Sequence, residues 1–94
     1  MDRYVVIRTV EMPPEAVERT AEWLRATEPT RQAWGMLFQL LARQIISPRT
    51  YVLVQVWQSE EAYNRWRASE DRKKLAAEAP RMYIHATTYA YREV

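Results

Sequence analysis

The sequence predicts an α+β domain, with one antiparallel sheet and two helices on a single face, in the order β-α-β-β-α-β. Three observations favour this class. Stretches rich in β-branched and aromatic residues occupy Arg3–Val10 and Tyr51–Trp57, side chains alternate again over 81–92, and good helix formers follow each of the first two stretches. Because 94 residues are enough for one core only, we expect residues 1–94 to form a single domain.

Two prolines separate the first strand from the first helix. Alternation along Arg3–Val10 places Arg8 on one face of the strand and Ile7 on the other. The prolines at 13 and 14 end the strand and suit the first turn of a helix, which we expect over Glu15–Thr27. The segment Thr27–Ala33 contains a proline and polar residues, so the sequence predicts a connection that ends this helix.

The stretch Met36–Ile46 is ambiguous by its local pattern. Its leucines have helical spacing and good helix propensity. However, a short turn with a proline at 48 leads from it into the strong strand Tyr51–Trp57, and a hairpin needs a strand on each side of its turn. We therefore predict that Met36–Ile46 is a strand.

The second half of the chain supplies a helix and the last strand. Ser59 is a good N-cap, and Ala62, Tyr63 and Trp66 lie along one side of the helix that it begins. A more polar helical segment, Glu70–Ala79, follows. The strand over 81–92 then has one face formed by Tyr83, His85, Thr87, Tyr89 and Tyr91.

Both faces of the third strand are apolar, although the helices can cover only one face of the sheet. Val52, Val54 and Val56 lie on one side of it, and Tyr51, Leu53 and Trp57 on the other. We therefore expect the second face to pack against the same face of another copy, as a homodimer.

Composition excludes several classes of protein. Hydrophobic residues at 48% and charged residues at 28% exclude a disordered tail, and the absence of cysteine with a single histidine excludes a thiolate or histidine-rich metal site within one chain. The 14 basic and 12 acidic residues are interleaved, so nucleic acid is not an expected partner. No apolar run suits a membrane span or a signal peptide, so we expect a cytoplasmic location. No Gly-rich phosphate loop is found, and no cofactor is expected.

The stretch from Val54 to Ser69, VQVWQSEEAYNRWRAS, resembles the antibiotic biosynthesis monooxygenase domain, a group of dimeric α/β barrel proteins with a ferredoxin-like fold. It is similar to that family's strand-exit tryptophan, capping serine, acidic turn, aromatic residue and second tryptophan. Gly35 also lies where the family opens its second strand. The resemblance covers nearly the whole chain and supports the strand at Met36–Ile46. It implies an oxygenase that acts on a small phenol, quinol or other aromatic without metal or flavin, in a dry pocket with a base.

The candidate site residues come from this comparison and from the side chains themselves. Trp66 either forms a wall of the pocket or packs in the core, and the same two roles are open to Tyr63 beside it. His85 is the side chain that titrates nearest neutrality, so it is the first choice for the base, although a lone histidine on a strand is more often structural. Further candidates for contact with a small aromatic ligand are Trp34, Ile7 and Tyr83.

Three alternatives stay open. Arg8 lies in an apolar strand, so it either pairs with a carboxylate or binds an anion. The protein could be a non-catalytic ligand-binding or stress-related relative with the same pocket. A haem-binding or haem-degrading branch is also similar, but its asparagine and histidine positions fall at Ile7 and at or near Ala76, so only its tryptophan, Trp66, is matched.

Overall fold

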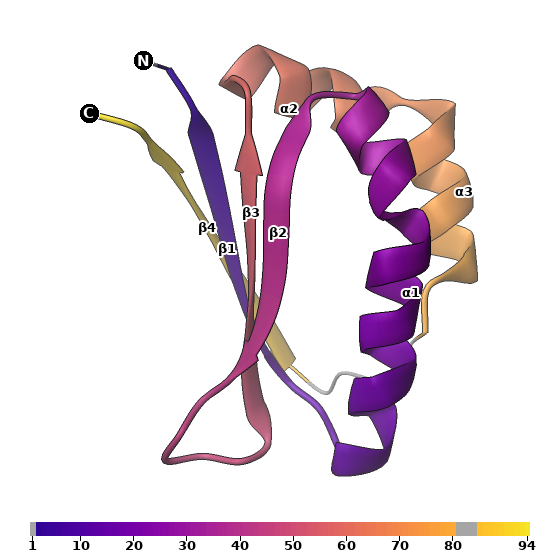
Figure 1. The fold of residues 1–94 in the computed structure, drawn as a ribbon, viewed down its shortest axis with the longest axis vertical. Helices are drawn as coiled ribbons and strands as arrows, with labels where there is room; N and C mark the ends of the chain where they lie inside the picture. Colours follow the sequence, from indigo (N-terminus) through magenta and orange to yellow (C-terminus); the bar gives the residue numbers. More distant parts are fainter. Residues whose placement is uncertain (1, 81–84) are drawn as a thin grey trace.

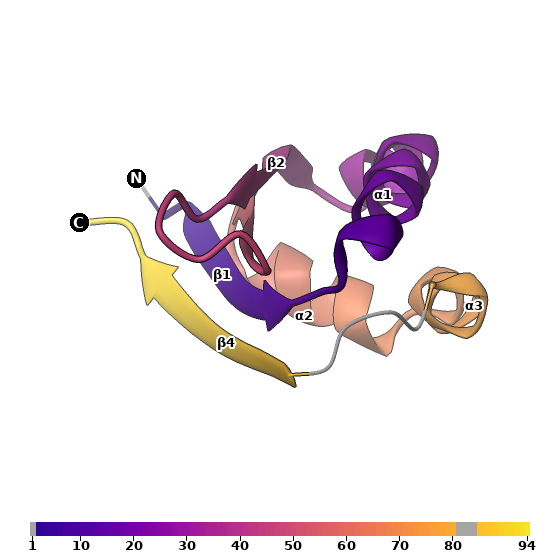
Figure 2. The same cartoon turned by 90° about the horizontal axis from the view of Figure 1, so that it is seen from below.

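A computed structural model describes residues 2–80 and 85–94 of the chain. The elements along these residues are β1 (Tyr4–Glu11), α1 (Pro14–Ala33), β2 (Met36–Arg43), β3 (Thr50–Trp57), α2 (Glu60–Ala68), α3 (Glu70–Glu78) and β4 (His85–Arg92). The strands form one antiparallel sheet in the order β2-β3-β1-β4. Helices α1 and α3 lie on one side of it, and α2 runs from the end of β3 towards α3 (Figures 1 and 2). The predicted ferredoxin-like α+β fold is confirmed.

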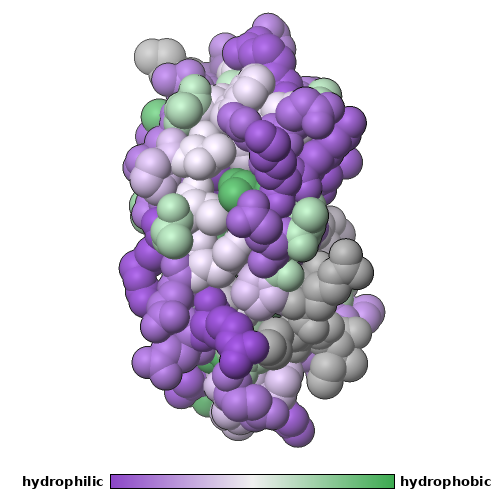
Figure 3. Space-filling view, turned by 90° about the vertical axis from the view of Figure 1, so that its right-hand side faces the viewer, coloured by the Kyte–Doolittle hydropathy of each residue, from purple (hydrophilic) through white to green (hydrophobic). Residues whose placement is uncertain are grey.

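The core lies between the sheet and the helices and consists of two small clusters. Val6, Met36, Trp57 and Trp66 form the first cluster, and Val10, Met12, Ala16 and Tyr51 form the second. The strand residues of both clusters are on the face that points to the helices, as the alternation of side chains requires. From the helical side the surface is mostly hydrophilic, with only scattered hydrophobic residues (Figure 3). None of the helices among the described residues has the length and apolar character that a membrane span requires.

The first helix is longer than predicted. We expected Thr27–Ala33 to be a connection, but α1 continues to Ala33 with Pro29 inside it, so that prediction was wrong. Pro29 costs the helix one backbone hydrogen bond. The Thr27 hydroxyl donates to the carbonyl of Trp23 at 2.6 Å and accepts from Arg31 at 2.8 Å, and Arg31 itself is buried. Side-chain bonds and tertiary packing thus hold the helix together across the proline.

The ambiguous segment forms the strand β2, which confirms the hairpin argument. The strand begins after Gly35, whose φ of +109° is a conformation that residues with a side chain rarely adopt. A register shift between Met36 and Phe38 leaves Leu37 as an extra residue. Because of this bulge, Met36 is buried under the helices, whereas Phe38 lies on the opposite face.

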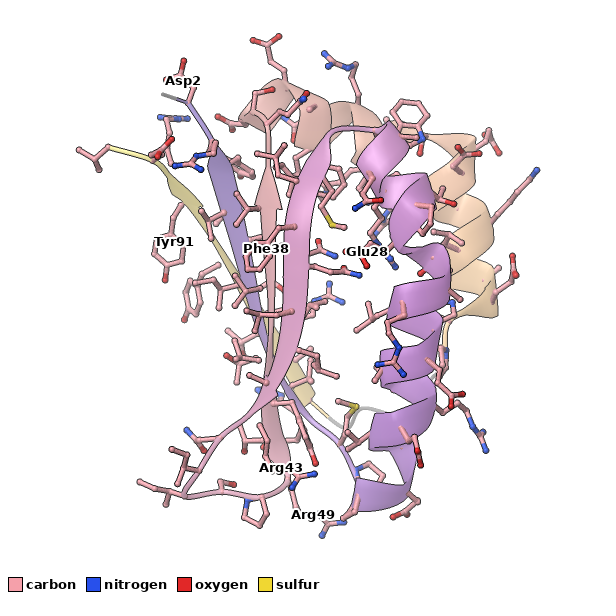
Figure 4. The ribbon with its side chains drawn as sticks, in the orientation of Figure 1. Asp2, Glu28, Phe38, Arg43, Arg49 and Tyr91 are labelled. Carbon is pink, nitrogen blue, oxygen red and sulfur yellow. The ribbon has the colours of Figure 1, made fainter. Side chains whose placement is uncertain are left out.

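The face of the sheet away from the helices is apolar and uncovered in the single chain. Phe38 is 47% exposed and Tyr91 is 51% exposed. Figure 4 shows Tyr91 pointing away from α1. The pairing of Ile7 with Val54 and with Tyr89 places these three residues side by side in the middle of the face. This uncovered face is the feature on which the expected homodimer depends.

Candidate functional site

A cavity of about 260 Å³ lies between the helices and the sheet. All three helices and the strands β1, β3 and β4 contribute to its wall, and we call it the arginine cavity because four arginines line it. It is lined by Val6, Arg8, Trp23, Leu24, Arg31, Leu53, Gln55, Tyr63, Trp66, Arg67, Arg72, Leu75, Ala76, Ala79 and Thr88. Its volume is slightly below the roughly 300–1,000 Å³ of typical ligand sites, so it suits a ligand of one or two rings.

Trp66 forms an aromatic wall of the cavity. It lies on the inner side of α2 and is 5% exposed. Its ring stacks on Trp57 with centroids 6.0 Å apart, and the ring of Trp34 lies 6.5 Å away. The Trp34 indole N–H donates to Asp71 on α3 at 3.0 Å, which holds that ring in place. These contacts fix the orientation of Trp66 before any ligand arrives.

Tyr63 extends this aromatic wall by one turn of α2. Its ring meets that of Trp57 edge-on at 5.3 Å and that of Tyr4 at 5.4 Å. The guanidinium carbon of Arg67 lies 5.8 Å from the centre of the Tyr63 ring. An aromatic surface with a cation beside it therefore faces the cavity.

Arg31 is the most buried charged residue of the cavity. It is 4% exposed, and its guanidinium carbon lies 4.9 Å from the centre of the Trp23 ring and 6.0 Å from that of Trp66. Its Nη1 donates to Thr27 Oγ1 at 2.8 Å. Burial lowers the pKa of Arg31 to about 10, and Glu28, one turn away on α1, opposes this shift weakly. The side chain is still a cation at neutral pH.

The other cavity arginines also have no carboxylate partner among the described residues. Arg8 projects from β1, and its Nε donates to the Thr88 hydroxyl at 3.1 Å. Arg67 and Arg72 are on α2 and α3 and are exposed. The ion pairs along the described chain involve other basic residues, namely Arg3, Lys73 and Arg92. The charged side chains of the described wall are all basic, which favours anions in the cavity.

A second, larger space of about 390 Å³ opens between α1 and β2. Both signs of charge line it, through Arg25, Arg43 and Glu28, the last two of which are labelled in Figure 4. A hydrogen bond of 3.1 Å between Gln55 and Gln39 runs from the wall of the arginine cavity to the wall of this cleft. We take the arginine cavity as the candidate site, because it combines aromatic walls with unbalanced charge.

The arrangement is suited to a flat, electron-rich ligand that is, or becomes, an anion. Ring faces on α1 and α2 can stack on it, and the guanidinium groups can hold a phenolate or carboxylate oxygen. No group of three or more His, Cys, Asp or Glu side chains within the described residues could hold a metal ion.

Comparison with known proteins identifies the family. A sequence model of the family described as antibiotic biosynthesis monooxygenase matches residues 3–78 of the chain, which include all elements from β1 to α3. The chain belongs to the antibiotic biosynthesis monooxygenase family. No curated protein sequence matches it significantly.

Several solved structures share the fold of this chain. A candidate antibiotic biosynthesis monooxygenase from Bordetella bronchiseptica superposes with a TM-score of 0.84 at 16% identity, over 100% of this chain and 99% of that one. A conserved protein from Methanosarcina mazei Go1 has a TM-score of 0.80 at 16% identity, covering 100% and 95%. A structure named antibiotic biosynthesis monooxygenase has a TM-score of 0.71 at 22% identity, covering 97% and 98%. At these identities the likeness concerns the fold alone.

Two of the site residues predicted from the sequence lie in the cavity of this family member, and a third supports it. Trp66 and Tyr63 line the cavity. Trp34 does not line it but packs behind Trp66. The roles proposed for these residues towards a ligand stay predictions.

His85 and Ile7 are not brought to the arginine cavity. On β4 the side chain of Thr88 lines the cavity, so alternation turns His85 to the other face of the sheet, where it is exposed. Its Nε2 lies 3.4 Å from the hydroxyl of Thr87. Ile7 faces the same way as His85, because its neighbour Arg8 points into the cavity. Tyr83, the last predicted residue, lies outside the described residues.

The position matched to the haem-degrading branch's histidine, Ala76, does line the cavity, but it offers no ligand atom. The asparagine position was placed at Ile7, which lies across the sheet. Of the three residues of that branch, the cavity contains only the tryptophan, Trp66.

The sequence reasoning missed the residue with the most unusual environment, Arg31. It lies seven residues after Leu24, and thus on the same face of α1, but this relationship holds only if the helix continues through Pro29. The prediction that the helix ends near Thr27 concealed it. Arg8 was singled out correctly as a residue that needs a partner, and the structure gives it a hydroxyl instead of a carboxylate.

Proposed function

We propose that this protein is a cofactor-independent monooxygenase that oxidises a small hydroxyarene or quinol in the arginine cavity. The observation that carries the proposal is the environment of the cavity in a member of this family, with the rings of Trp23, Tyr63 and Trp66 beside four arginines and no described carboxylate. Stacking would orient a flat substrate, and the guanidinium groups would stabilise its anion.

The arginines have a direct chemical role in this proposal. A phenol bound beside Arg31 and Arg8 has a lowered pKa, because nearby positive charge favours the phenolate. The phenolate is electron-rich enough to reduce oxygen directly. In the conversion of a naphthol to a naphthoquinone, one oxygen atom enters the product and the other leaves as water with the two hydrogens that the substrate loses. Oxygen is the oxidant, and no further reductant is needed.

The proton acceptor has two candidates. We propose that the substrate proton passes to water, because the described wall contains no histidine or carboxylate and the arginines favour ionisation. The alternative base is His85, which would have to act from the opposite face of the sheet. Replacing His85 by alanine separates the two routes, since it abolishes turnover only in the second.

Oxygen consumption with 1-naphthol, 1,4-naphthohydroquinone and anthrone tests the activity, with enzyme-free samples to subtract autoxidation. We expect uptake above that background and one atom of 18O from labelled oxygen in the product. In Trp66→Phe, kcat/KM should fall about tenfold, equivalent to ~1.4 kcal/mol of transition-state stabilisation. The matched control Trp57→Phe lies behind the wall and should have a smaller effect. The absence of oxygen uptake with all three compounds would contradict the proposal. Thermal stabilisation by the same compounds without oxygen uptake would favour a binding protein.

We further propose that the working form is a homodimer joined through the open face of the sheet. The apolar residues Ile7, Val54, Phe38 and Tyr91 lie on this face, and a second copy of the same face would remove them from water. Sedimentation at micromolar concentration should give twice the 11.2 kDa mass of the chain. The cytoplasmic location expected from the sequence stays a prediction.

A further inference from the structure

The unbalanced charge of the arginine cavity is larger than one phenolate requires. Four arginines from β1, α1, α2 and α3 converge on a space of about 260 Å³, and the described wall contributes no acidic side chain. A phenolate neutralises a single charge. Solvent screens the exposed Arg67 and Arg72. The buried Arg31 and the half-buried Arg8 together leave one positive charge that a phenolate does not neutralise, which favours a second anionic group on the occupant.

Arg31 carries the strongest part of this argument. A buried cation is costly unless it is paired, and removing the cost is the usual role of a neighbouring carboxylate. Arg31 is 4% exposed, yet its only described hydrogen-bond acceptor is the neutral hydroxyl of Thr27. The ring faces of Trp23 and Trp66 offset part of the cost through cation–π contacts. A guanidinium that is buried beside a cavity and bonded only to a neutral hydroxyl is suited to bind an anion there.

The pairing of charges elsewhere in the molecule supports this reading. Arg3 pairs with Glu93 and Arg92 pairs with Glu60 on the surface, where such pairs contribute little to stability. Arg3 and Arg92 thus each bond to a carboxylate. Among the described residues, however, Arg31 and Arg8 bond only to hydroxyl groups, and Glu28 acts on Arg31 through its charge without a hydrogen bond. A purely structural arginine in the interior would be expected to show the opposite pattern.

We propose that the ligand of the arginine cavity is an aromatic acid, that is, a flat one- or two-ring system bearing a carboxylate in addition to its oxidisable hydroxyl group. The inference rests on the proposed function only where it says that the hydroxyl group is oxidised. Binding of the aromatic acid can be tested without any reaction. A carboxylate matches the planar fork of a guanidinium in a two-point contact. The aromatic walls formed by Trp23, Tyr63 and Trp66 accept the ring.

Two probes of nearly equal shape test whether the charge of the ligand determines its affinity for the cavity. 1-Hydroxy-2-naphthoic acid and 1-hydroxy-2-naphthamide share the ring system and the hydroxyl, and differ in the charge of the substituent. Equilibrium dialysis without oxygen, at pH 7.5 and low salt, measures both without turnover. We expect the acid to bind at least tenfold more tightly than the amide, with a preference that weakens as salt is raised.

Variants assign this preference to the cavity. Arg31→Met should reduce affinity for the acid at least tenfold and leave affinity for the amide nearly unchanged, which also shows that the cavity is intact. Arg8→Gln, on a different element, should reduce the preference in the same direction. Arg65→Gln is the matched control, because Arg65 is exposed on α2 and does not line the cavity. It should behave as the unmodified protein.

The outcomes distinguish this inference from the proposed function. Preferential binding of the acid without oxygen uptake upholds the inference and removes the monooxygenase. Oxygen uptake together with equal binding of acid and amide upholds the monooxygenase and overturns the inference. The inference is overturned if neither probe binds at millimolar concentration, or if the preference survives in both Arg31→Met and Arg8→Gln.

Discussion

The hydroxyl of Ser69 donates to the carbonyl of Trp66 at 2.7 Å and accepts from the backbone N–H of Arg72 at 3.1 Å. The buried side chain of Ser69 therefore lies at the end of α2 and caps the start of α3. Both of its partners, Trp66 and Arg72, line the arginine cavity. Ser59, by contrast, caps only the start of α2, through the N–H of Ala62.

Ser69→Ala should therefore destabilise the protein more than Ser59→Ala. Loss of an N-cap alone costs about 1 kcal/mol. Ser69→Ala also leaves a carbonyl without its side-chain donor, so we expect about 2 kcal/mol. Urea unfolding monitored by circular dichroism measures both. Equal costs would show that the bond to the Trp66 carbonyl adds nothing to the cap of α3.

Gly35→Ala should destabilise the chain by about 1–3 kcal/mol. A methyl group at this position would lie 3.0 Å from the Cβ of Ala62 and 3.3 Å from Oε1 of Gln58, in addition to the strain of a φ of +109°. Ala62 is buried on α2 and cannot move aside easily. Thermal unfolding checks the effect, and an unchanged midpoint would mean that this turn can change its conformation.

The order of most elements could be predicted from the sequence because β1, β3, β4 and the cap at Ser59 have local signals. The strand β2, whose own pattern also fits a helix, was predicted from the hairpin turn and the family resemblance. The serine cap, the β-branched strands and the hairpin turn at 47–50 depend on neighbouring residues only. The continuation of α1 through Pro29 could not be predicted, because position 31 packs against Trp66 on α2, a contact that no local pattern reveals. Trp66 could be predicted as a site residue from its place in the helix and from the family resemblance. The cluster of arginines could not, because its members come from four elements that meet only in the folded chain.

Arg31→Met should not reduce the stability of the ligand-free protein. The substitution removes a cation whose burial lowers its pKa to about 10, and places an apolar side chain of similar length against Trp23. The lost bond to Thr27 and the lost cation–π contacts offset part of the gain, so the free energy of unfolding should rise on the order of 1 kcal/mol. Chemical unfolding without ligand is the measurement. A fall of that size would assign Arg31 a structural role.

The contact between Arg3 and Glu93 should give stability a small dependence on pH in the acid range, because the pair is exposed to solvent. The hydrogen bond from Arg3 lowers the pKa of Glu93 from 4.5 to about 2. A carboxylate with a lowered pKa stabilises the fold above its unfolded pKa, and this contribution is lost as the pH falls from about 4.5 towards 2. In Glu93→Gln the urea midpoint of unfolding should therefore depend less on pH over this range. Added salt should weaken the dependence in part, because the pair is near solvent. A profile identical to that of the unmodified protein would contradict the pairing.

A charge in the middle of the open sheet face should prevent assembly without unfolding the chain. Val54 pairs with Ile7 and Leu40 on this face, away from the helices and from the arginine cavity. Val54→Asp would place a carboxylate where two apolar faces meet, and the cost of desolvating it in both copies favours the monomer. We expect sedimentation to change from twice the chain mass to the chain mass, with a retained circular dichroism spectrum. The control Glu18→Gln changes an exposed residue of α1 and should sediment as the unmodified protein. A Val54→Asp protein that still sediments at twice the chain mass would place the contact between copies elsewhere on the surface.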